Sequence, residues 1–175
     1  MAVCELLGAS GLGRIREIDR SERAEAVFVV EEGVLRRIPR RVEVPPWNDG
    51  ELAETEQRIA ASVACGGVLL GVLDDGSLAA AAVLGGTFLA SGPDRLELVF
   101  LHVSRPHRRR GHASALFDEV CRRARARGAA QLYISSSDVE PAVRFYLARG
   151  CRPAAHVDPV IAERWPEDIQ LELEL

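Results

Sequence analysis

The chain has 175 residues, of which 47% are hydrophobic and 27% charged, and its formal net charge is −4 at pH 7. These proportions are typical of a globular protein and exclude a disordered chain. The length fits one hydrophobic core, so we expect a single domain over residues 1–175. The negative charge disfavours a nucleic-acid partner, and no apolar run approaches the roughly 20 residues that span a bilayer.

The N-terminus and the cysteines indicate the compartment. The opening residues, MAVCELLGAS, lack the basic region and long apolar core of a signal peptide, so we expect a cytoplasmic protein. The four cysteines form no Cys-x-x-Cys pair and have no close histidine. Reduced, mostly buried thiols are therefore expected, and neither a disulfide set nor a metal site is predicted. These residues are Cys4, Cys65, Cys121 and Cys151.

The first elements in chain order combine helices and extended segments. Residues 11–25, GLGRIREIDRSERAE, are interpreted as a helix. Residues 26–47 are predicted to be extended on both sides of a turn at Glu32–Gly33, with a Pro-Pro-Trp corner at their end. Residues 49–67 form a second predicted helix, which two glycines close.

The middle of the chain predicts three strands and a helix. Residues 68–89 hold two apolar runs divided by Asp75–Gly76, which is a hairpin signal. Residues 95–104, RLELVFLHVS, are almost continuously apolar, as in a central strand covered on both faces. From Ala113 the apolar residues recur at helical spacing until Gly128 ends the pattern.

The last elements complete a mixed α/β order. Residues 130–137 are a predicted strand. Residues 138–150 are a predicted short helix, with Asp138 or Ser137 as the N-cap and Pro141 in its first turn. The strict alternation of DIQLELEL, at residues 168–175, predicts a final antiparallel strand.

The stretch RPHRRRGHASAL, residues 105–116, lies between a predicted strand and a helix start. A helix N-terminus offers unpaired N–H groups and a positive dipole end, so it can bind an anion. Gly111 and Ala113 are small enough for a ligand to approach the backbone. The stretch contains neither the GxxxxGK[ST] pattern of a Walker loop nor the GxGxxG pattern of a Rossmann fold, so both are excluded. Two interpretations stay open on this chemistry, a pyrophosphate-type anion site and a solvated basic turn.

Two motifs in this region resemble the GNAT family of N-acetyltransferases. VSRPHRRRGHASALFDEV resembles the family's acetyl-CoA motif, [RQ]-x-x-G-x-[GA], with Arg108, Gly111 and Ala113 in its positions. AVRFYLARGC, residues 142–151, resembles the family's A-x-x-F-Y-x-x-x-G-F, although Cys151 replaces the final aromatic. The resemblance is clear over about residues 78–151.

The resemblance implies a GNAT fold. In this α/β fold a mixed, mostly antiparallel central sheet has helices on both faces, and two strands splay apart at the acetyl-CoA site. The implied protein is a cytoplasmic bacterial enzyme that moves an acetyl group from acetyl-CoA to a primary amine by direct transfer in a ternary complex. The acceptor would be a small molecule or a peptide, with no nucleic acid and no membrane as partner; a homodimer stays open. The alternative is a non-catalytic acetyl-CoA sensor or interaction module.

The resemblance also assigns the cofactor residues. Backbone N–H groups from Arg108 to Ser114 should hold the pyrophosphate, the Arg108 side chain should face the phosphates, and the strand Leu101–Val103 should splay and pair with the pantetheine arm. His107 and His112 are expected to be surface neighbours rather than catalysts. The full set is Leu101, His102, Val103, Arg108, Arg109, Arg110, Gly111, His112, Ala113, Ser114, Ser137 and Tyr146.

Acetyl transfer needs a base for the amine proton and an acid for the leaving thiolate. By resemblance Tyr146 is the acid, and the alternative is a packing aromatic. Glu97 is the base candidate, because ELVFLHVS resembles the strand of the histone acetyltransferase branch in which a glutamate at this position is the base; the alternative is a solvated strand end. The period of two places His102 on the opposite strand face from Glu97. The loop SSSD replaces an asparagine that many family members carry, so Ser136, Ser137 or Asp138 would supply that cofactor contact, and Ser137 is the residue included in the cofactor set.

Charge is divided unevenly along the chain, with acids concentrated between residues 42 and 94 and arginines between 104 and 152. An acidic acceptor cleft on the second helix would favour a cationic amine; the alternative is that Glu51, Glu54 and Glu56 face water. The segment Phe28–Trp47 is expected to flank the acceptor site. Its candidate substrate-binding residues are Phe28, Glu31 and Trp47.

Overall fold

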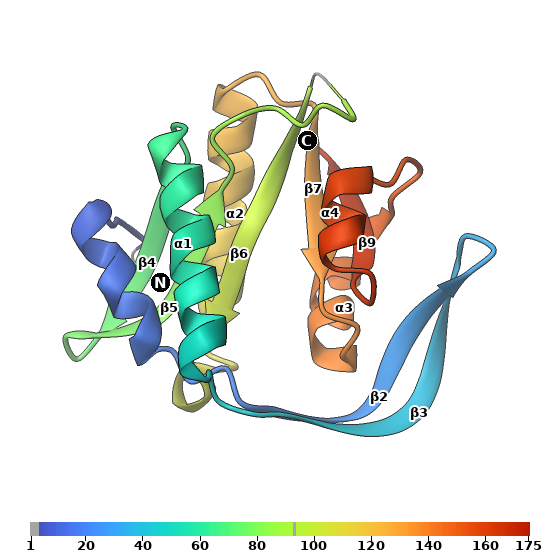
Figure 1. Ribbon diagram of the computed structural model, residues 1–175, viewed down its shortest axis with the longest axis horizontal. Coiled ribbons are helices and arrows are strands. Elements are labelled where there is room, and N and C mark those ends of the chain that lie inside the picture. Colours follow the sequence, from blue (N-terminus) through green and yellow to red (C-terminus); the bar gives the residue numbers. More distant parts are fainter. Residues whose placement is uncertain (1–3, 93) are drawn as a thin grey trace.

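The computed structural model describes residues 4–92 and 94–175. Its main sheet has seven strands in the order β1-β4-β5-β6-β7-β9-β8, and all neighbours are antiparallel except β6 and β7 (Figure 1). These strands are β1 (Glu5–Leu6), β4 (Val68–Asp74), β5 (Ser77–Leu84), β6 (Arg95–Val103), β7 (Gln131–Ser136), β8 (Arg152–Pro153) and β9 (Ile169–Glu174). The predicted hairpin, central strand and final antiparallel strand are confirmed.

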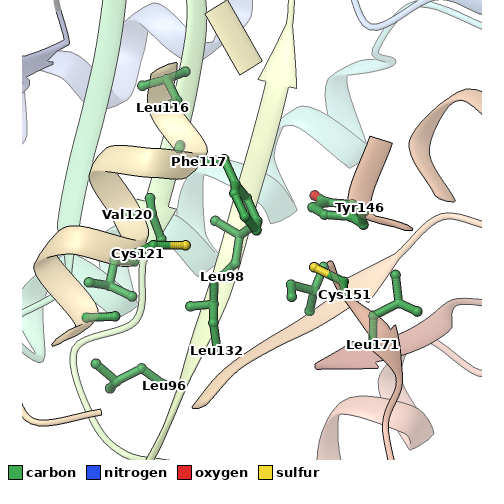
Figure 2. Packing of buried hydrophobic residues seen from close by; sticks show 14 of the residues in the cluster. Leu96, Leu98, Leu116, Phe117, Val120, Cys121, Leu132, Tyr146, Cys151 and Leu171 are labelled. Atoms are coloured by element: carbon green, nitrogen blue, oxygen red, sulfur yellow. The ribbon is translucent and has the colours of Figure 1, made fainter. Parts of the chain in front are cut away.

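Helices cover both faces of this sheet, which confirms the expected layers. The 3-10 helix η1 (Ala9–Glu17) and α1 (Asp49–Ala64) pack on one face with a cluster that includes Ile15 and Ile59. α2 (His112–Ala126) and α3 (Glu140–Ala148) cover the other face over a larger cluster. Figure 2 shows this larger cluster, with Phe117 and Val120 of α2 over Leu98 of β6. The short helix α4 (Pro159–Arg164) precedes β9.

The second predicted helix begins where its capping residues dictate. The Asn48 side chain accepts from the Glu51 N–H at 2.9 Å, and the Glu51 carboxylate accepts from the Asn48 N–H at 3.2 Å. This reciprocal capping box satisfies two backbone donors that the first helical turn leaves free. One of the three acidic residues considered for an acceptor cleft is therefore engaged in the helix cap.

A separate two-stranded arm lies beside the main sheet. β2 (Glu22–Glu31) and β3 (Val34–Val44) pair antiparallel around the predicted turn. Glu32 and Gly33 have φ values of 51° and 77°, the left-handed pair that a tight hairpin turn requires. The arm reaches α3, where the Phe28 N–H donates to the Asp138 carbonyl at 2.8 Å. Figure 1 shows it extending from the α1 side of the sheet past α3.

The prediction of one helix over residues 11–25 is wrong in its second half. The 3-10 helix ends at Glu17, and residues 22–25 belong to β2. The Asp19 side chain accepts from the Ser21 N–H at 2.8 Å, and this local turn ends the helical path. Pairing with β3 then outweighs the helical propensity of the segment, because that long-range pairing satisfies the backbone groups of a whole strand.

The predicted cap of α3 is also wrong. Val139 occupies the N-cap position and no side chain caps the helix, although Pro141 lies in the first turn as expected. Asp138 instead accepts from Arg40 of the arm at 2.9 Å. The carboxylate is thus engaged by a residue far away in sequence. α4 and the short strands β1 and β8 were not among the predicted elements.

Candidate active site

The two central strands separate in the middle of the sheet. β6 pairs in parallel with β7 only over Arg95–Leu98, against Gln131–Ile134. β6 then continues to Val103 while it stays paired with β5. Its edge towards β7 therefore carries unpaired backbone groups, and an extended ligand can add to such an edge as a strand. The expected splaying is confirmed, with Leu101–Val103 on the free edge, and Figure 1 shows the two strands diverging there.

The loop between β6 and α2 presents a run of backbone N–H groups. After a 3-10 turn, η2 (Arg105–His107), α2 starts at His112, and its first helical bond runs from the Ala115 N–H to the Gly111 carbonyl at 3.0 Å. Within the described residues, the N–H groups from 109 to 114 meet no acceptor. Arg109 and Gly111 have φ values of 64° and 84°. Such alternation of backbone hand turns successive N–H groups to one side, as in an anion-binding nest.

The three consecutive arginines of this loop have different partners. The Arg108 guanidinium turns inward, donates to two backbone carbonyls and pairs with Glu22 at 3.1 Å. Arg110 pairs with Asp74 at 2.9 Å. Arg109 is exposed and has no ion pair among the residues that the structure describes. The Arg108 side chain therefore holds the loop against β2, and its expected contact with phosphates stays a prediction.

β6 contains a β-bulge just after its pairing with β7 ends. Leu98 and Phe100 pair with two adjacent residues of β5, so Val99 is an extra residue without a partner on that strand. Val99 and Phe100 both pack into the cluster under η1 and α1. Side chains that follow Val99 on the strand therefore lie on the face opposite to the one that regular alternation predicts.

The bulge places His102 on the same face of the sheet as Glu97, so the expectation of opposite faces is wrong. The centre of the His102 ring lies 5.5 Å from the centre of the Trp47 ring and 4.7 Å from the centre of the Phe100 ring. Burial, and secondarily the charge of Arg20, lowers the pKa of His102 to about 4. The imidazole is therefore neutral at neutral pH.

Glu97 is half-buried in the last paired part of β6. Its neighbours Leu96 and Leu98 belong to the α2/α3 cluster, so its side chain lies on the face of α1 and α4. Burial raises the pKa of Glu97, and the charges of Arg58 and Arg164 oppose that rise. A carboxyl whose pKa is displaced upwards is better matched to proton transfer near neutral pH.

Arg58, which the sequence analysis did not select, reaches this position from α1. Its guanidinium donates to the Val99 carbonyl at the bulge and lies 5.6 Å from the centre of the Trp165 ring. Burial lowers its pKa, and the negative charge of Glu97 opposes that change. One signal could have identified it: Arg58 is the one basic residue between residues 42 and 94.

Tyr146 approaches from the other face of the sheet. It is 8% exposed in the α2/α3 cluster, with its ring centre 5.9 Å from that of Phe117 and 5.2 Å from that of Phe145. Figure 2 shows the ring extending from α3 towards Phe117, with the hydroxyl oxygen at its far end. Burial raises the pKa of Tyr146 well above its usual range. The hydroxyl therefore keeps its proton at neutral pH.

Asp168 is a second acid near these groups that the sequence analysis missed. It accepts from the Ser135 hydroxyl at 2.8 Å, and burial raises its pKa. Its negative charge also contributes to the raised pKa of Tyr146, while Arg58 lowers the pKa of Asp168 itself. Asp168 thus lies within electrostatic reach of groups from α1 and α3. No motif surrounds it in the sequence, since it precedes β9 in an irregular segment.

The candidate acceptor residues are dispersed. Phe28 packs in the α2/α3 cluster, whereas Trp47 packs in the η1/α1 cluster and donates to the Ile18 carbonyl at 2.9 Å. Glu31 is exposed at the tip of the arm and pairs with Arg36 at 2.9 Å. The structure therefore does not bring Phe28, Glu31 and Trp47 into one cluster. Ser137 is exposed just after the end of β7.

The acids of α1 have structural partners. Glu51 pairs with Arg20, which in turn lies 4.2 Å over the ring of Trp47. Glu56 lies 3.5 Å from Arg16, and Glu54 is exposed. These contacts favour the interpretation in which the acids stabilise α1 or face water over the one in which they line an acceptor cleft.

A free strand edge beside a loop of unpaired N–H groups defines a domain that can bind an extended, phosphate-bearing ligand. The sequence model of the acetyltransferase (GNAT) family matches residues 34–151, which is more than half of the chain. The chain therefore belongs to the acetyltransferase (GNAT) family. As a member of that family it is an acyltransferase that uses acetyl-CoA. None of the curated protein sequences matches it.

Solved structures share the fold. Nourseothricin acetyltransferase is 20% identical with a TM-score of 0.74, and the match covers 98% of this chain and 97% of that one. A putative streptothricin acetyltransferase from Bacillus anthracis, in complex with acetyl coenzyme A, is 14% identical with a TM-score of 0.67 over 100% and 98%. The ribosomal-protein-S18-alanine N-acetyltransferase from Escherichia coli is 16% identical with a TM-score of 0.61 over 99% and 94%. Among the described residues, no helix is long and apolar enough to cross a membrane.

Replacement of Gly111 by glutamate should weaken acetyl-CoA binding about tenfold or more. Its left-handed backbone costs a residue with a Cβ about 1–2 kcal/mol, and a carboxylate beside the start of α2 would repel phosphate. A Cβ at Gly111 meets no atom within 4 Å, so a clash would not be the cause. Calorimetry measures the affinity. Gly111→Asn, which tolerates this backbone better, is the control, and unchanged affinity in Gly111→Glu would contradict the anion site.

Proposed function

We propose that the chain acetylates a primary amine of a small molecule or a peptide by direct transfer in a ternary complex. One observation supports this proposal above the others. Glu97 lies on the α1 face, next to the residue at which β6 leaves β7, and Tyr146 belongs to the cluster on the opposite face, which includes Leu98. An acceptor on the α1 face and a thioester along the free edge of β6 would then meet between a base and an acid.

Acetyl-CoA, when bound, supplies the acetyl thioester. The free edge of β6 after Leu98 holds its extended arm, and the N–H groups of residues 109–114 hold its phosphates. The exposed Arg109 adds positive charge at the same loop. Arg108 contributes indirectly to cofactor binding, because its ion pair with Glu22 keeps the loop in place.

Glu97 removes a proton from the acceptor amine, directly or through water, because only the neutral amine is a nucleophile. Arg58 stabilises the ionised carboxylate that this role requires. His102, on the same face, is neutral but weakly basic, so it serves better as a hydrogen-bond partner than as the base.

Tyr146 donates its hydroxyl proton, fully or as a hydrogen bond, to the departing sulfur. Its raised pKa keeps the proton available at neutral pH. This chemistry involves no covalent bond to the protein, so a paired nucleophile and base of the Ser-His or Cys-His type are not required.

The acceptor class can be tested with a panel of amines, with release of free thiol from acetyl-CoA as the readout. The panel should contain a streptothricin-type antibiotic, an aminoglycoside, a polyamine and a peptide with an N-terminal alanine. We expect turnover with at least one of them, intersecting initial-rate lines and no acetylated protein by mass spectrometry. Acetyl-CoA binding without turnover on any amine would instead favour a non-catalytic sensor or interaction module.

A further inference from the structure

Three potential metal ligands meet at the edge of the phosphate loop. Asp74 ends β4, His107 lies in the 3-10 turn after β6, and His112 is the first residue of α2. Each offers one ligand atom, and these atoms lie within 4.8 Å of one another. Oδ2 of Asp74 is 2.9 Å from Nδ1 of His107 and 2.9 Å from Nη1 of Arg110. The three come from separate elements that the fold brings together.

The His112 side chain has two buried ring nitrogens without a hydrogen-bond partner among the described residues. A buried polar atom without a partner costs about 1–3 kcal/mol, so such atoms usually face a ligand or a bound water. A bound metal ion would satisfy one of these nitrogens, because an imidazole nitrogen is a common metal ligand.

We propose that Asp74, His107 and His112 bind one divalent transition-metal ion of the zinc class. Two imidazoles and one carboxylate form a three-ligand donor set of the kind that leaves a further coordination position open. Bonds of about 2.0–2.2 Å in a tetrahedral site require ligand atoms roughly 3.3–3.6 Å apart. The ligand atoms lie within 4.8 Å of one another, so the half-buried side chains would have to move closer together to bind the ion.

The Arg110 side chain must move away from Asp74 for the ion to bind. Its guanidinium shares Oδ2 of Asp74 with His107, and a cation beside the metal would oppose binding. The Arg110 side chain is 55% exposed, so it can turn into solvent when the ion enters. Neither Glu97 nor Tyr146 belongs to this cluster, although the backbone N–H of His112 is also part of the loop before α2.

The test uses metal ions alone, with no acetyl-CoA present. Zn²⁺ is titrated by calorimetry, and Co²⁺ is titrated by its visible absorption, which reports the coordination geometry. The parent is Cys65→Ser, because the exposed Cys65 thiol is a competing ligand. We expect one ion per chain, and loss of affinity of about tenfold or more in His112→Ala, His107→Ala and Asp74→Asn.

His156→Ala is the matched control, because His156 is an exposed histidine outside the cluster, and it should bind as the parent does. Circular dichroism checks that each variant is folded. If His112→Ala does not fold, the variants His107→Ala and Asp74→Asn test the site in its place. Absence of binding by the parent, or equal affinity in all folded variants, would overturn the site.

Discussion

Replacement of Tyr146 by phenylalanine should lower the turnover number about 10²-fold or more and leave acetyl-CoA affinity nearly unchanged. The substitution removes the hydroxyl and keeps the ring, so the packing of Tyr146 against Phe117 and Phe145 is preserved. The lost proton donor affects only the step in which the sulfur departs. Single-turnover kinetics, combined with calorimetry of cofactor binding, measures both quantities.

Tyr133→Phe is the matched control, because Tyr133 is the other tyrosine of the chain. Its buried hydroxyl accepts from the Asp158 N–H at 2.9 Å, so its loss should reduce stability by about 1–3 kcal/mol. The turnover number of that variant should stay near the wild-type value. A Tyr146→Phe turnover number equal to the wild type, with chemistry rate-limiting, would return Tyr146 to a packing role.

Replacement of Glu97 by glutamine should lower the rate at neutral pH about 10²-fold or more, within the range for loss of a general base. Glutamine keeps the shape and removes the charge. Activity should recover as the pH rises, because the free amine then becomes abundant without help. In the wild type, kcat/KM should rise with pH through the raised pKa of Glu97, and that acid limb should disappear in the variant.

Substitution of Arg58 provides a second test of Glu97 as the base. Its positive charge lowers the pKa of Glu97 against the effect of burial, so Arg58→Met should move the acid limb to higher pH. Arg58→Lys keeps a positive charge and should move the limb less. Glu54→Gln, at an exposed acid of α1, is the control for a general change of charge and should leave the profile unchanged.

A different result would identify a different role for Glu97. If Glu97 only attracts a cationic acceptor, Glu97→Gln should raise KM for that amine, leave kcat near wild type and weaken the dependence on salt. If neither parameter changes, Glu97 is not the base. His102 or an ordered water would then follow as candidates, ahead of Glu31 and Glu32, which lie exposed at the tip of the arm.

Much of the site follows from local sequence. The hairpin at Asp75–Gly76 and the helical spacing of α2 depend on residues that are close along the chain. The apolar run of β6 is itself the signal of a strand buried on both faces. The positions of Gly111 and Tyr146 within their motifs also depend only on spacing along the chain. For these reasons the amino-acid sequence is sufficient to predict the loop, the acid candidate and the family.

Tertiary structure decided the rest, because contacts between distant segments leave no periodic signal. The β-bulge at Val99 exists only in the pairing of β6 with β5. Because of this one extra residue, His102 lies on the same face of the sheet as Glu97. Only the packing of α1 on the sheet brings Arg58 to the bulge. The sequence by itself determined which backbone segments form the loop before α2 and the splayed strand. The fold determined where the side chains point, because each adopts the direction in which distant charges and apolar surfaces are satisfied together.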